Sequence, residues 1–219
     1  MLQRILEPEV MDTPEEASDY DAMDHAEVNR RFVADFLQAG TATGTILDVG
    51  TGTAQIPIEF CRQSAEGLIV AIDLAEEMLR IARQNVMNAG LTERIRLERV
   101  NARGLPFPDG AFNAVMSNSI IHHIPEPSGA FAEMVRVCAI GGRLFLRDLL
   151  RPSDEKTLRN LVEMYAGDAN DHQRAMFANS LHAALTLEEV RDIVTTLGFK
   201  AASVQATSDR HWTWAAVKS

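Results

Sequence analysis

A short glycine-rich stretch carries the clearest chemistry in the sequence. Residues 48–54 read Asp-Val-Gly-Thr-Gly-Thr-Ala, and a second acid, Asp73, follows 25 residues after Asp48. Glycines at positions 50 and 52 would let a ligand approach the backbone closely, because they lack a Cβ. An acid at the end of the next strand is suitably placed to accept both ribose hydroxyls of an adenosine. The pattern therefore predicts a nucleoside-binding turn.

Two residues in and beside this turn distinguish between kinds of nucleotide. Position 55 is Gln, where the dinucleotide-binding fingerprint needs a third Gly or an Ala. Asp48 would be unfavourable beside a pyrophosphate but suits a ligand that carries an ammonium and a sulfonium. Both residues disfavour a nicotinamide-dependent oxidoreductase, which stays open as an alternative.

The elements that must position the turn follow from the spacing of apolar residues. From residue 45 onward, short apolar runs alternate with longer amphipathic ones, which predicts an α/β fold with a doubly wound sheet and helices on both faces. We expect strands over residues 45–50, 68–73, 95–101, 113–119 and 143–149. We expect helices over residues 54–64, 75–89 and 128–137, the second of which should end at Gly90.

The last third of the sequence has a different pattern. Residues 154–184 are helical in character and carry no strand signal. Thr186 and Glu189 can form a capping box for a helix that ends near Gly198. Two strands, over 200–207 and 211–217, are too close together for a parallel crossover, so we expect an antiparallel hairpin.

Three blocks of sequence add a resemblance to this interpretation. They are residues 46–53 (Ile-Leu-Asp-Val-Gly-Thr-Gly-Thr), 105–112 (Leu-Pro-Phe-Pro-Asp-Gly-Ala-Phe) and 141–144 (Gly-Gly-Arg-Leu). Together they resemble the class I S-adenosylmethionine-dependent methyltransferases, especially the branch that includes the ubiquinone and menaquinone C-methyltransferases. The resemblance covers residues 40–150 most strongly. It implies a Rossmann-like sheet of seven strands, the last antiparallel, with S-adenosyl-L-methionine as cofactor and S-adenosyl-L-homocysteine as product.

The resemblance also implies which residues hold the cofactor. Gly50 and Gly52 would lie under its methionine part, and Asp73 would hold its ribose. Asn101 stands where the family usually has an acid, yet an Asn carbonyl can still accept a hydrogen bond from the adenine amino group. Asn113 similarly replaces an acid at the start of the fourth strand. The full expected set is Asp48, Gly50, Thr51, Gly52, Asp73, Leu74, Met78, Asn101, Ala102, Ser117 and Asn118.

Candidate catalytic residues come from two places. His122 and His123 follow the fourth strand, and ligands in such folds lie beyond the carboxyl ends of the strands. An imidazole there can serve as a general base, or it can have a structural or cofactor-packing role, and both interpretations stay open. Tyr20 is a third candidate, and we expect no metal site.

The regions outside the three blocks are expected to cover the site. We expect residues 1–38 to form an N-terminal arm and helix over the active site, and 39–219 to form the cofactor-binding domain with a helical lid at about 151–184. Acidic residues crowd the first 30 positions, which is typical of a solvated, mobile arm. Because the reacting methyl must be shielded from water, we instead predict that the arm folds over the pocket and orders with ligand, with Tyr20 or His25 touching the substrate.

Composition limits the partners. The net charge of −10 would repel a phosphate backbone, which disfavours nucleic acid. No apolar run is long enough for stable membrane insertion, and no signal-peptide core is present, so we expect a cytoplasmic protein. Cys61 and Cys138 are expected to be reduced, buried thiols with a structural role. An oligomer is left open.

These expectations converge on one function. We expect a methyltransferase that transfers a methyl group from S-adenosyl-L-methionine to a small-molecule acceptor by in-line displacement, a reaction that depends mainly on orientation. The motifs do not name the acceptor or the atom that is methylated. A non-catalytic, cofactor-binding subunit that supports a partner is the main alternative.

Overall fold

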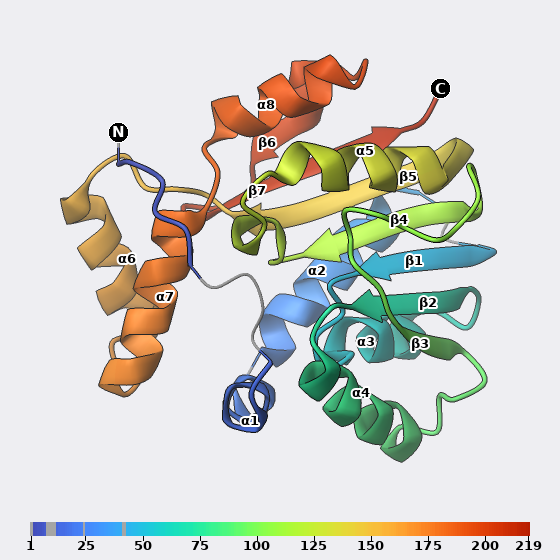
Figure 1. Cartoon of the computed structure of the whole chain (residues 1–219), viewed down its shortest axis with the longest axis horizontal. Helices are drawn as coiled ribbons and strands as arrows, with labels where there is room; N and C mark the ends of the chain where they lie inside the picture. The colour runs from blue at the N-terminus through green and yellow to red at the C-terminus, as the bar shows by residue number, and fades with distance from the viewer. Residues whose placement is uncertain (1, 8–11, 24, 41–42) are drawn as a thin grey trace. The chain divides into compact units, whose positions relative to one another are not determined.

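The computed structural model describes residues 2–7, 12–23, 25–40 and 43–219. No helix within these ranges is both long and apolar enough to cross a membrane. Figure 1 shows the elements, which are, in chain order, α1 (Pro14–Ala22), α2 (Ala26–Gln38), β1 (Thr45–Val49), α3 (Gln55–Gln63), β2 (Leu68–Asp73), α4 (Glu76–Asn88), β3 (Ile95–Arg99), β4 (Phe112–Asn118), η1 (Ile121–His123), α5 (Pro127–Val137), β5 (Cys138–Leu149), α6 (Glu155–Ala166), α7 (Asp171–Ala183), α8 (Leu187–Thr196), η2 (Ala201–Ser203), β6 (Val204–Ala206) and β7 (His211–Val217).

The seven strands form one sheet in the order β3-β2-β1-β4-β5-β7-β6. β1 pairs in parallel with β2 and with β4, and β2 pairs in parallel with β3. β6 and β7 pair antiparallel, with Val204 opposite Trp214. The predicted fold class and the closing antiparallel hairpin are therefore confirmed.

One strand is longer than predicted. β5 begins at Cys138, not at Arg143, because the end of the chain extends its pairing. The Gly141 N–H donates to the Lys218 carbonyl over 2.7 Å, and the Lys218 N–H donates to the Gly142 carbonyl over 2.9 Å. These partners are far apart in sequence, so local patterning did not reveal the pairing.

Two strands are shorter than predicted by two residues or more. β3 ends at Arg99 because Asn101 closes a turn in which its Oδ1 accepts from the Arg103 N–H over 2.9 Å. The expected strand over 200–207 is divided into the 3₁₀ turn η2 and the three-residue strand β6.

The chain divides into two compact units, which are described separately. We call the first the turn unit, because it contains the glycine-rich turn, and the second the histidine unit. The turn unit comprises Val10–Asn118, Gly129–Leu146 and Ala215–Ser219, and the histidine unit comprises Met1–Glu9, Ser119–Ser128 and Arg147–Trp214.

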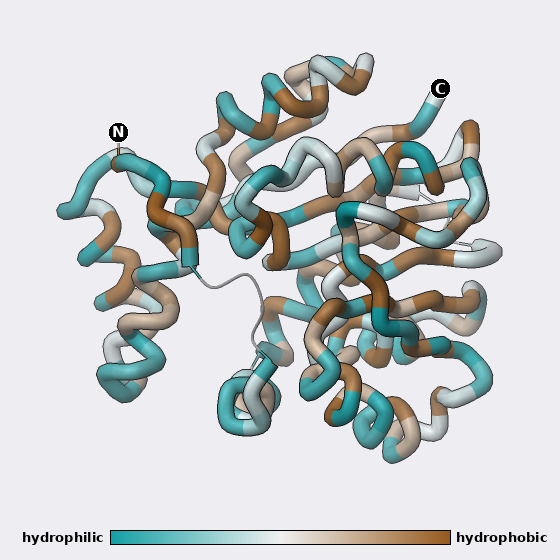
Figure 2. Tube along the Cα trace, viewed as in Figure 1, coloured by the Kyte–Doolittle hydropathy of each residue, from teal (hydrophilic) through white to brown (hydrophobic). Residues whose placement is uncertain are grey.

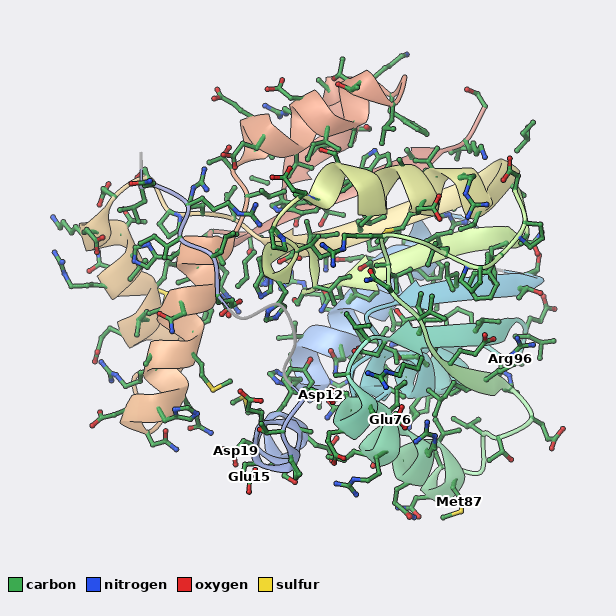
Figure 3. All side chains as sticks on the ribbon, in the orientation of Figure 1. Asp12, Glu15, Asp19, Glu76, Met87 and Arg96 are labelled. Carbon is green, nitrogen blue, oxygen red and sulfur yellow. The ribbon has the colours of Figure 1, made fainter. Side chains whose placement is uncertain are left out.

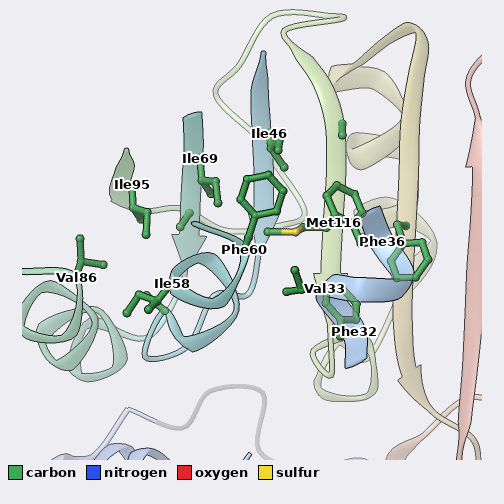
Figure 4. Packing of buried hydrophobic residues seen from close by; sticks show 14 of the residues in the cluster. Phe32, Val33, Phe36, Ile46, Ile58, Phe60, Ile69, Val86, Ile95 and Met116 are labelled. Atoms are coloured by element: carbon green, nitrogen blue, oxygen red, sulfur yellow. The ribbon is translucent and has the colours of Figure 1, made fainter. Parts of the chain in front are cut away.

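Phenylalanine rings pack among aliphatic side chains in the core of the turn unit (Figure 4). Phe32 and Phe36 of α2 are fully buried and meet Phe145 of β5 edge to face, with ring centroids 5.3 and 5.7 Å apart. Such contacts add to the free energy gained from burying the rings. Figure 2 shows the alternating hydrophobic and hydrophilic residues along α4, whose buried side chains are Met78, Leu79, Ala82 and Val86.

Both cysteines lie in the turn unit as free thiols, as expected. Cys138 is fully buried, and burial raises the pKa of its thiol to about 11. Cys61 is only half-buried, and burial raises its pKa as well.

Helices α6 and α7 build the core of the histidine unit. Leu158 and Leu161 of α6 and Leu181 of α7 pack in one cluster with Leu149. The predicted capping box starts α8: Glu189 N–H donates to Thr186 Oγ1, and Thr186 N–H donates to the Glu189 carboxylate.

Candidate functional site

The glycine-rich turn is pinned to the end of β2. The N–H groups of Gly50 and Thr51 both donate to the Ile72 carbonyl, over 2.8 and 2.9 Å. Gly50 and Gly52 have φ angles of 75° and 55°, a region that glycine enters without steric cost. The backbone path of the turn therefore explains the glycines before any ligand is considered.

Asp73 braces this turn from the end of β2. Its Oδ2 accepts from the Gly52 N–H over 2.8 Å, and its Oδ1 accepts from the Ala75 N–H over 2.9 Å. Burial raises the pKa of Asp73, and these backbone donors offset part of the rise. Each carboxylate oxygen keeps a further lone pair, so the group can also accept from ribose hydroxyls.

Asp48 is a buried acid with one carboxylate oxygen that lacks a hydrogen-bond partner. Asp48 is 1% exposed, and its Oδ2 accepts no hydrogen bond from the described residues. Burial raises its pKa to about 7. The Asp73 charge adds to this rise, and the nearby Thr51 hydroxyl, which lies outside hydrogen-bonding geometry, offsets part of it. Unpaired buried polar atoms at a turn are the kind that a ligand satisfies.

Strand register gathers the other expected cofactor residues at the same edge of the turn unit. Val49 lies opposite Ile72 of β2 and Ser117 of β4, so these strands end side by side. The Ser117 hydroxyl is buried and donates to the Val49 carbonyl over 2.9 Å, which gives it a structural role. Asn118 is the last residue of β4, and Asn101 and Ala102 follow β3.

The two apolar residues expected near the adenine lie beside this edge. Met78 is 6% exposed and packs with Ala17 and Ala75. Leu74 follows Asp73 and accepts a hydrogen bond at its carbonyl from Arg99 Nε over 3.0 Å. Their contact with an adenine ring stays a prediction.

The acidic arm forms a helix in its described part, residues 12–23. Thr13 and Glu16 make a capping box at the start of α1, with Pro14 in the first turn. Asp12 Oδ1 accepts from the Glu77 N–H over 2.9 Å and so caps α4, whose own N-cap side chain makes no such bond (Figure 3). A negative charge there also interacts favourably with the helix dipole. The described residues of the arm therefore form a capped helix, on which Glu15 and Asp19 are exposed to solvent.

Tyr20 of α1 lies over the glycine-rich turn. A Cβ built on Gly52 would meet Tyr20 Cε1 at 3.5 Å, and the Tyr20 ring lies 5.1 Å from the His25 ring, centroid to centroid. Burial and the charges of Asp73 and Asp48 raise the pKa of Tyr20 to about 12. Its phenol thus stays protonated at neutral pH and can donate a hydrogen bond. Its contact with a substrate stays a prediction.

A polar network holds α1 in this place, and the sequence analysis missed it. Asp21 Oδ1 accepts from Asn85 Nδ2 over 2.9 Å and from Gln55 Nε2 over 3.3 Å. Gln55 Oε1 in turn accepts from Asn29 Nδ2 over 3.1 Å. Gln55, which breaks the dinucleotide fingerprint, therefore links the start of α3 to the arm.

The two histidines belong to the histidine unit, where they meet two acids. His122 Nδ1 lies 2.5 Å from Asp148 Oδ1, and its Nε2 lies 3.4 Å from Glu7 Oε1. His123 Nδ1 lies 3.2 Å from the same Glu7 oxygen. The predicted catalytic residues are thus divided between the units, since Tyr20 lies in the turn unit.

Burial and charge act in opposite directions on this group. Burial opposes protonation of His122, but the charges of Asp148 and Glu7 and the hydrogen bond to Asp148 together outweigh it, so the pKa of His122 is raised. Burial alone would raise the pKa of Asp148, but His122 and backbone N–H donors lower it. Burial raises the pKa of Glu7 in spite of the nearby His122. Glu7 and Asp148 were not predicted; an acid inside the apolar run of residues 144–150 was the available signal for Asp148.

Comparison with known proteins agrees with this geometry. A family profile described as "Methyltransferase domain" matches residues 47–146. The ubiquinone/menaquinone biosynthesis C-methyltransferase UbiE of Marinomonas sp. is 26% identical over 181 residues, which is 77% of this chain and 71% of that protein.

Solved structures share the fold. A putative S-adenosyl-L-methionine-dependent methyltransferase from Methanococcus maripaludis has a TM-score of 0.73 at 17% identity, covering 98% of this chain and 97% of the other. A SAM-dependent methyltransferase from Aquifex aeolicus has a TM-score of 0.69 at 20% identity, covering 94% and 99%.

Proposed function

Since the chain is a class I S-adenosylmethionine-dependent methyltransferase, we propose that it methylates a small-molecule acceptor. One relative is named for quinone biosynthesis and is 26% identical, which supports a small organic acceptor. The net charge of −10 disfavours nucleic acid, whose phosphates would be repelled.

The residues of the turn unit fit the cofactor. The observation that carries this fit is Asp48, whose buried Oδ2 has no partner among the described residues and can interact with a cationic methionine moiety. Asp73 would accept from the ribose hydroxyls, and the absent side chains of Gly50 and Gly52 would leave room beside the backbone. When bound, S-adenosylmethionine supplies an electrophilic methyl group on a sulfonium.

The chain's own contribution is to bind, orient and exclude water. A well-oriented reaction can gain about 7 to 11 kcal/mol from positioning alone, so methyl transfer does not require a strong base. Tyr20, whose ring lies beside Gly52, would cover the turn, and its protonated phenol would donate a hydrogen bond to a ligand. The base role of His122 and His123 stays a prediction.

The non-catalytic alternative rests on Asn101 and Asn113, two residues that stand where the family usually has an acid, and the structure gives Asn113 another role. Asn113 Oδ1 accepts from the Thr45 N–H over 2.9 Å, at the start of β1 and so at the strand end opposite the glycine-rich turn. Its replacement of an acid therefore has no bearing on the cofactor residues. Asn101 lies beside them and can still accept hydrogen bonds.

Calorimetry and a turnover assay test this proposal. We expect S-adenosylmethionine and S-adenosylhomocysteine to bind with micromolar affinity or better, and NAD not to bind. Formation of S-adenosylhomocysteine is then followed against a panel of quinols, phenols and amines, with mass spectrometry of the acceptor. Absence of cofactor binding at millimolar concentration would refute the proposal, and binding without turnover on any acceptor would favour the non-catalytic alternative.

A further inference from the structure

Three side chains of the histidine unit bring metal-binding atoms to one point. Glu7 Oε1 lies 3.4 Å from His122 Nε2 and 3.2 Å from His123 Nδ1, and the three ligand atoms all lie within 4.8 Å of one another. Charge-assisted hydrogen bonds between nitrogen and carboxylate oxygen are shorter, about 2.7 to 2.9 Å. Atoms bound to one ion at about 2.1 Å are about 3.0 to 3.5 Å apart. The spacing is therefore longer than an ideal charge-assisted hydrogen bond and matches the spacing between ligands of a common ion.

Asp148 fixes the orientation that His122 needs as a ligand. Its Oδ1 lies 2.5 Å from His122 Nδ1, and its Oδ2 accepts from the backbone N–H of Ile121. With Nδ1 donating to the carboxylate, the lone pair of the imidazole is on Nε2, the atom nearest Glu7. A carboxylate behind a ligating histidine is the usual outer shell of a metal site.

The Glu7 carboxylate is held in place by its own neighbours. The single hydroxyl hydrogen of Ser180 is shared between the two Glu7 oxygens, which lie 3.2 and 3.3 Å from Ser180 Oγ. Three residues earlier, the Arg4 guanidinium anchors the N-terminal segment by donating to the carbonyls of His122, Ile124, Pro125 and Ala183. Figure 1 shows this segment running beside α7, and the Ile5 N–H donates to the His182 carbonyl.

Charge and burial call for a cation at this point. The side chains of Glu7 and Asp148 are 11% and 1% exposed. Arg4 interacts electrostatically with Asp148 but also with Glu189 and Glu126, so a further cation beside Glu7 would lower the cost of burying the two carboxylates. A proton on an imidazole or a divalent ion can supply this positive charge, and these two alternatives make different experimental predictions.

We propose that Glu7, His122 and His123 bind a divalent first-row transition-metal ion such as Zn²⁺ or Co²⁺. Imidazole nitrogens suit these ions, whereas Mg²⁺ prefers oxygen ligands. The ion ties the N-terminal segment to η1. Three protein ligands leave a fourth position for water or for an oxygen of a small molecule.

Titration with cobalt tests the site on the full chain. The purified protein is treated with a chelator, dialysed and titrated with CoCl₂, with visible d–d absorption as the signal, and with ZnCl₂ in calorimetry. We expect one ion per chain with micromolar affinity or better, no competition from millimolar Mg²⁺, and a higher thermal midpoint with the ion. Absence of a cobalt spectrum at millimolar CoCl₂ would overturn the proposal, because a protonated cluster gives none.

Matched variants assign the ligands. Glu7→Gln and His123→Asn should each weaken Co²⁺ binding at least tenfold, and Asp148→Asn should weaken it about 10- to 100-fold through the outer shell. His182→Asn is the control, because His182 lies outside the cluster, with its Nε2 3.9 Å from Glu155 Oε1. The affinity of this variant for Co²⁺ should equal that of the parent. Far-UV circular dichroism shows whether each variant is folded. If His123→Asn does not fold, the nearly isosteric Glu7→Gln is the deciding variant. Parental affinity in Glu7→Gln would also overturn the proposal.

Discussion

Replacing Asp48 by Asn should make the protein more stable and a poorer binder of its cofactor. Asp48 is 1% exposed, its Oδ2 has no hydrogen-bond partner among the described residues, and burial raises its pKa to about 7. Holding a carboxylate charge there costs free energy that the neutral amide of Asn does not incur. The same charge is what a cationic ligand needs.

The magnitude follows from the pKa. A rise from the ordinary value of 3.8 to about 7 corresponds to about 4 kcal/mol of lost stability once Asp48 is ionised in the cofactor-free protein. Between these two pKa values the folded state holds a proton that the unfolded state releases. The folded protein therefore has its full stability below about pH 4 and loses about 4 kcal/mol as the pH rises to about 7. We treat 4 kcal/mol as an upper bound, since water entering the turn stabilises the ionised form.

Urea unfolding at several pH values measures this effect. We compare the free energy of unfolding of Asp48→Asn with that of the parent. The difference should be smallest at pH 4.5 and should grow by up to about 1.4 kcal/mol per pH unit until about pH 7. Asp19→Asn, a change at an exposed acid of α1, is the control and should show no such growth. Calorimetry should show weaker S-adenosylmethionine binding to Asp48→Asn. A stability difference that does not depend on pH would refute the reasoning.

Three further predictions address other parts of the protein. Asp73→Ala should weaken cofactor binding by about 2 to 4 kcal/mol, measured by calorimetry, through the loss of charge-assisted hydrogen bonds; parental affinity would mean that Asp73 does not hold the ribose. Gln55→Ala should release α1, seen as faster hydrogen exchange in residues 14–22 with the strands unaffected, because Gln55 bonds to both Asp21 and Asn29. Burial lowers the pKa of His211 to about 4. The free energy of unfolding should therefore fall by up to about 3 kcal/mol as the pH falls from 6.5 to 4, because the unfolded state takes up a proton that the folded state does not. His211→Asn should flatten that part of the stability profile in urea unfolding, and an unchanged slope would contradict it.

The parts of the fold that the sequence predicted are those set by local chemistry. The Thr186 and Glu189 pair determines where α8 starts, and Gly90, with a φ of 69°, follows the end of α4 as expected of a C-terminal glycine. The start of β5 depends on Lys218, 76 residues beyond Gly142, and was missed because no local pattern encodes that pairing. The arm helix had a local signal in Thr13-Pro-Glu-Glu16, which the high density of acids in the arm obscured.

The candidate site divides in the same way. The glycine-rich turn and Asp73 could be predicted because one βαβ unit fixes their spacing. Glu7 could not be associated with His122 and His123, because the sequence places them more than a hundred residues apart and only tertiary packing brings them together. Its acidic neighbours in the arm also made it look like one more solvated charge.

The anchoring of the N-terminal segment has a consequence for biosynthesis. Arg4 leaves the ribosome well before its partner, because it bonds to the carbonyl of Ala183, 179 positions later, and Glu7 bonds to Ser180, 173 positions later. Chains are synthesised at about 5 to 20 residues per second, so the segment waits on the order of ten seconds or more for its partners. During translation it is open to proteases and to chaperones, and the histidine unit completes its folding only when most of the chain has emerged.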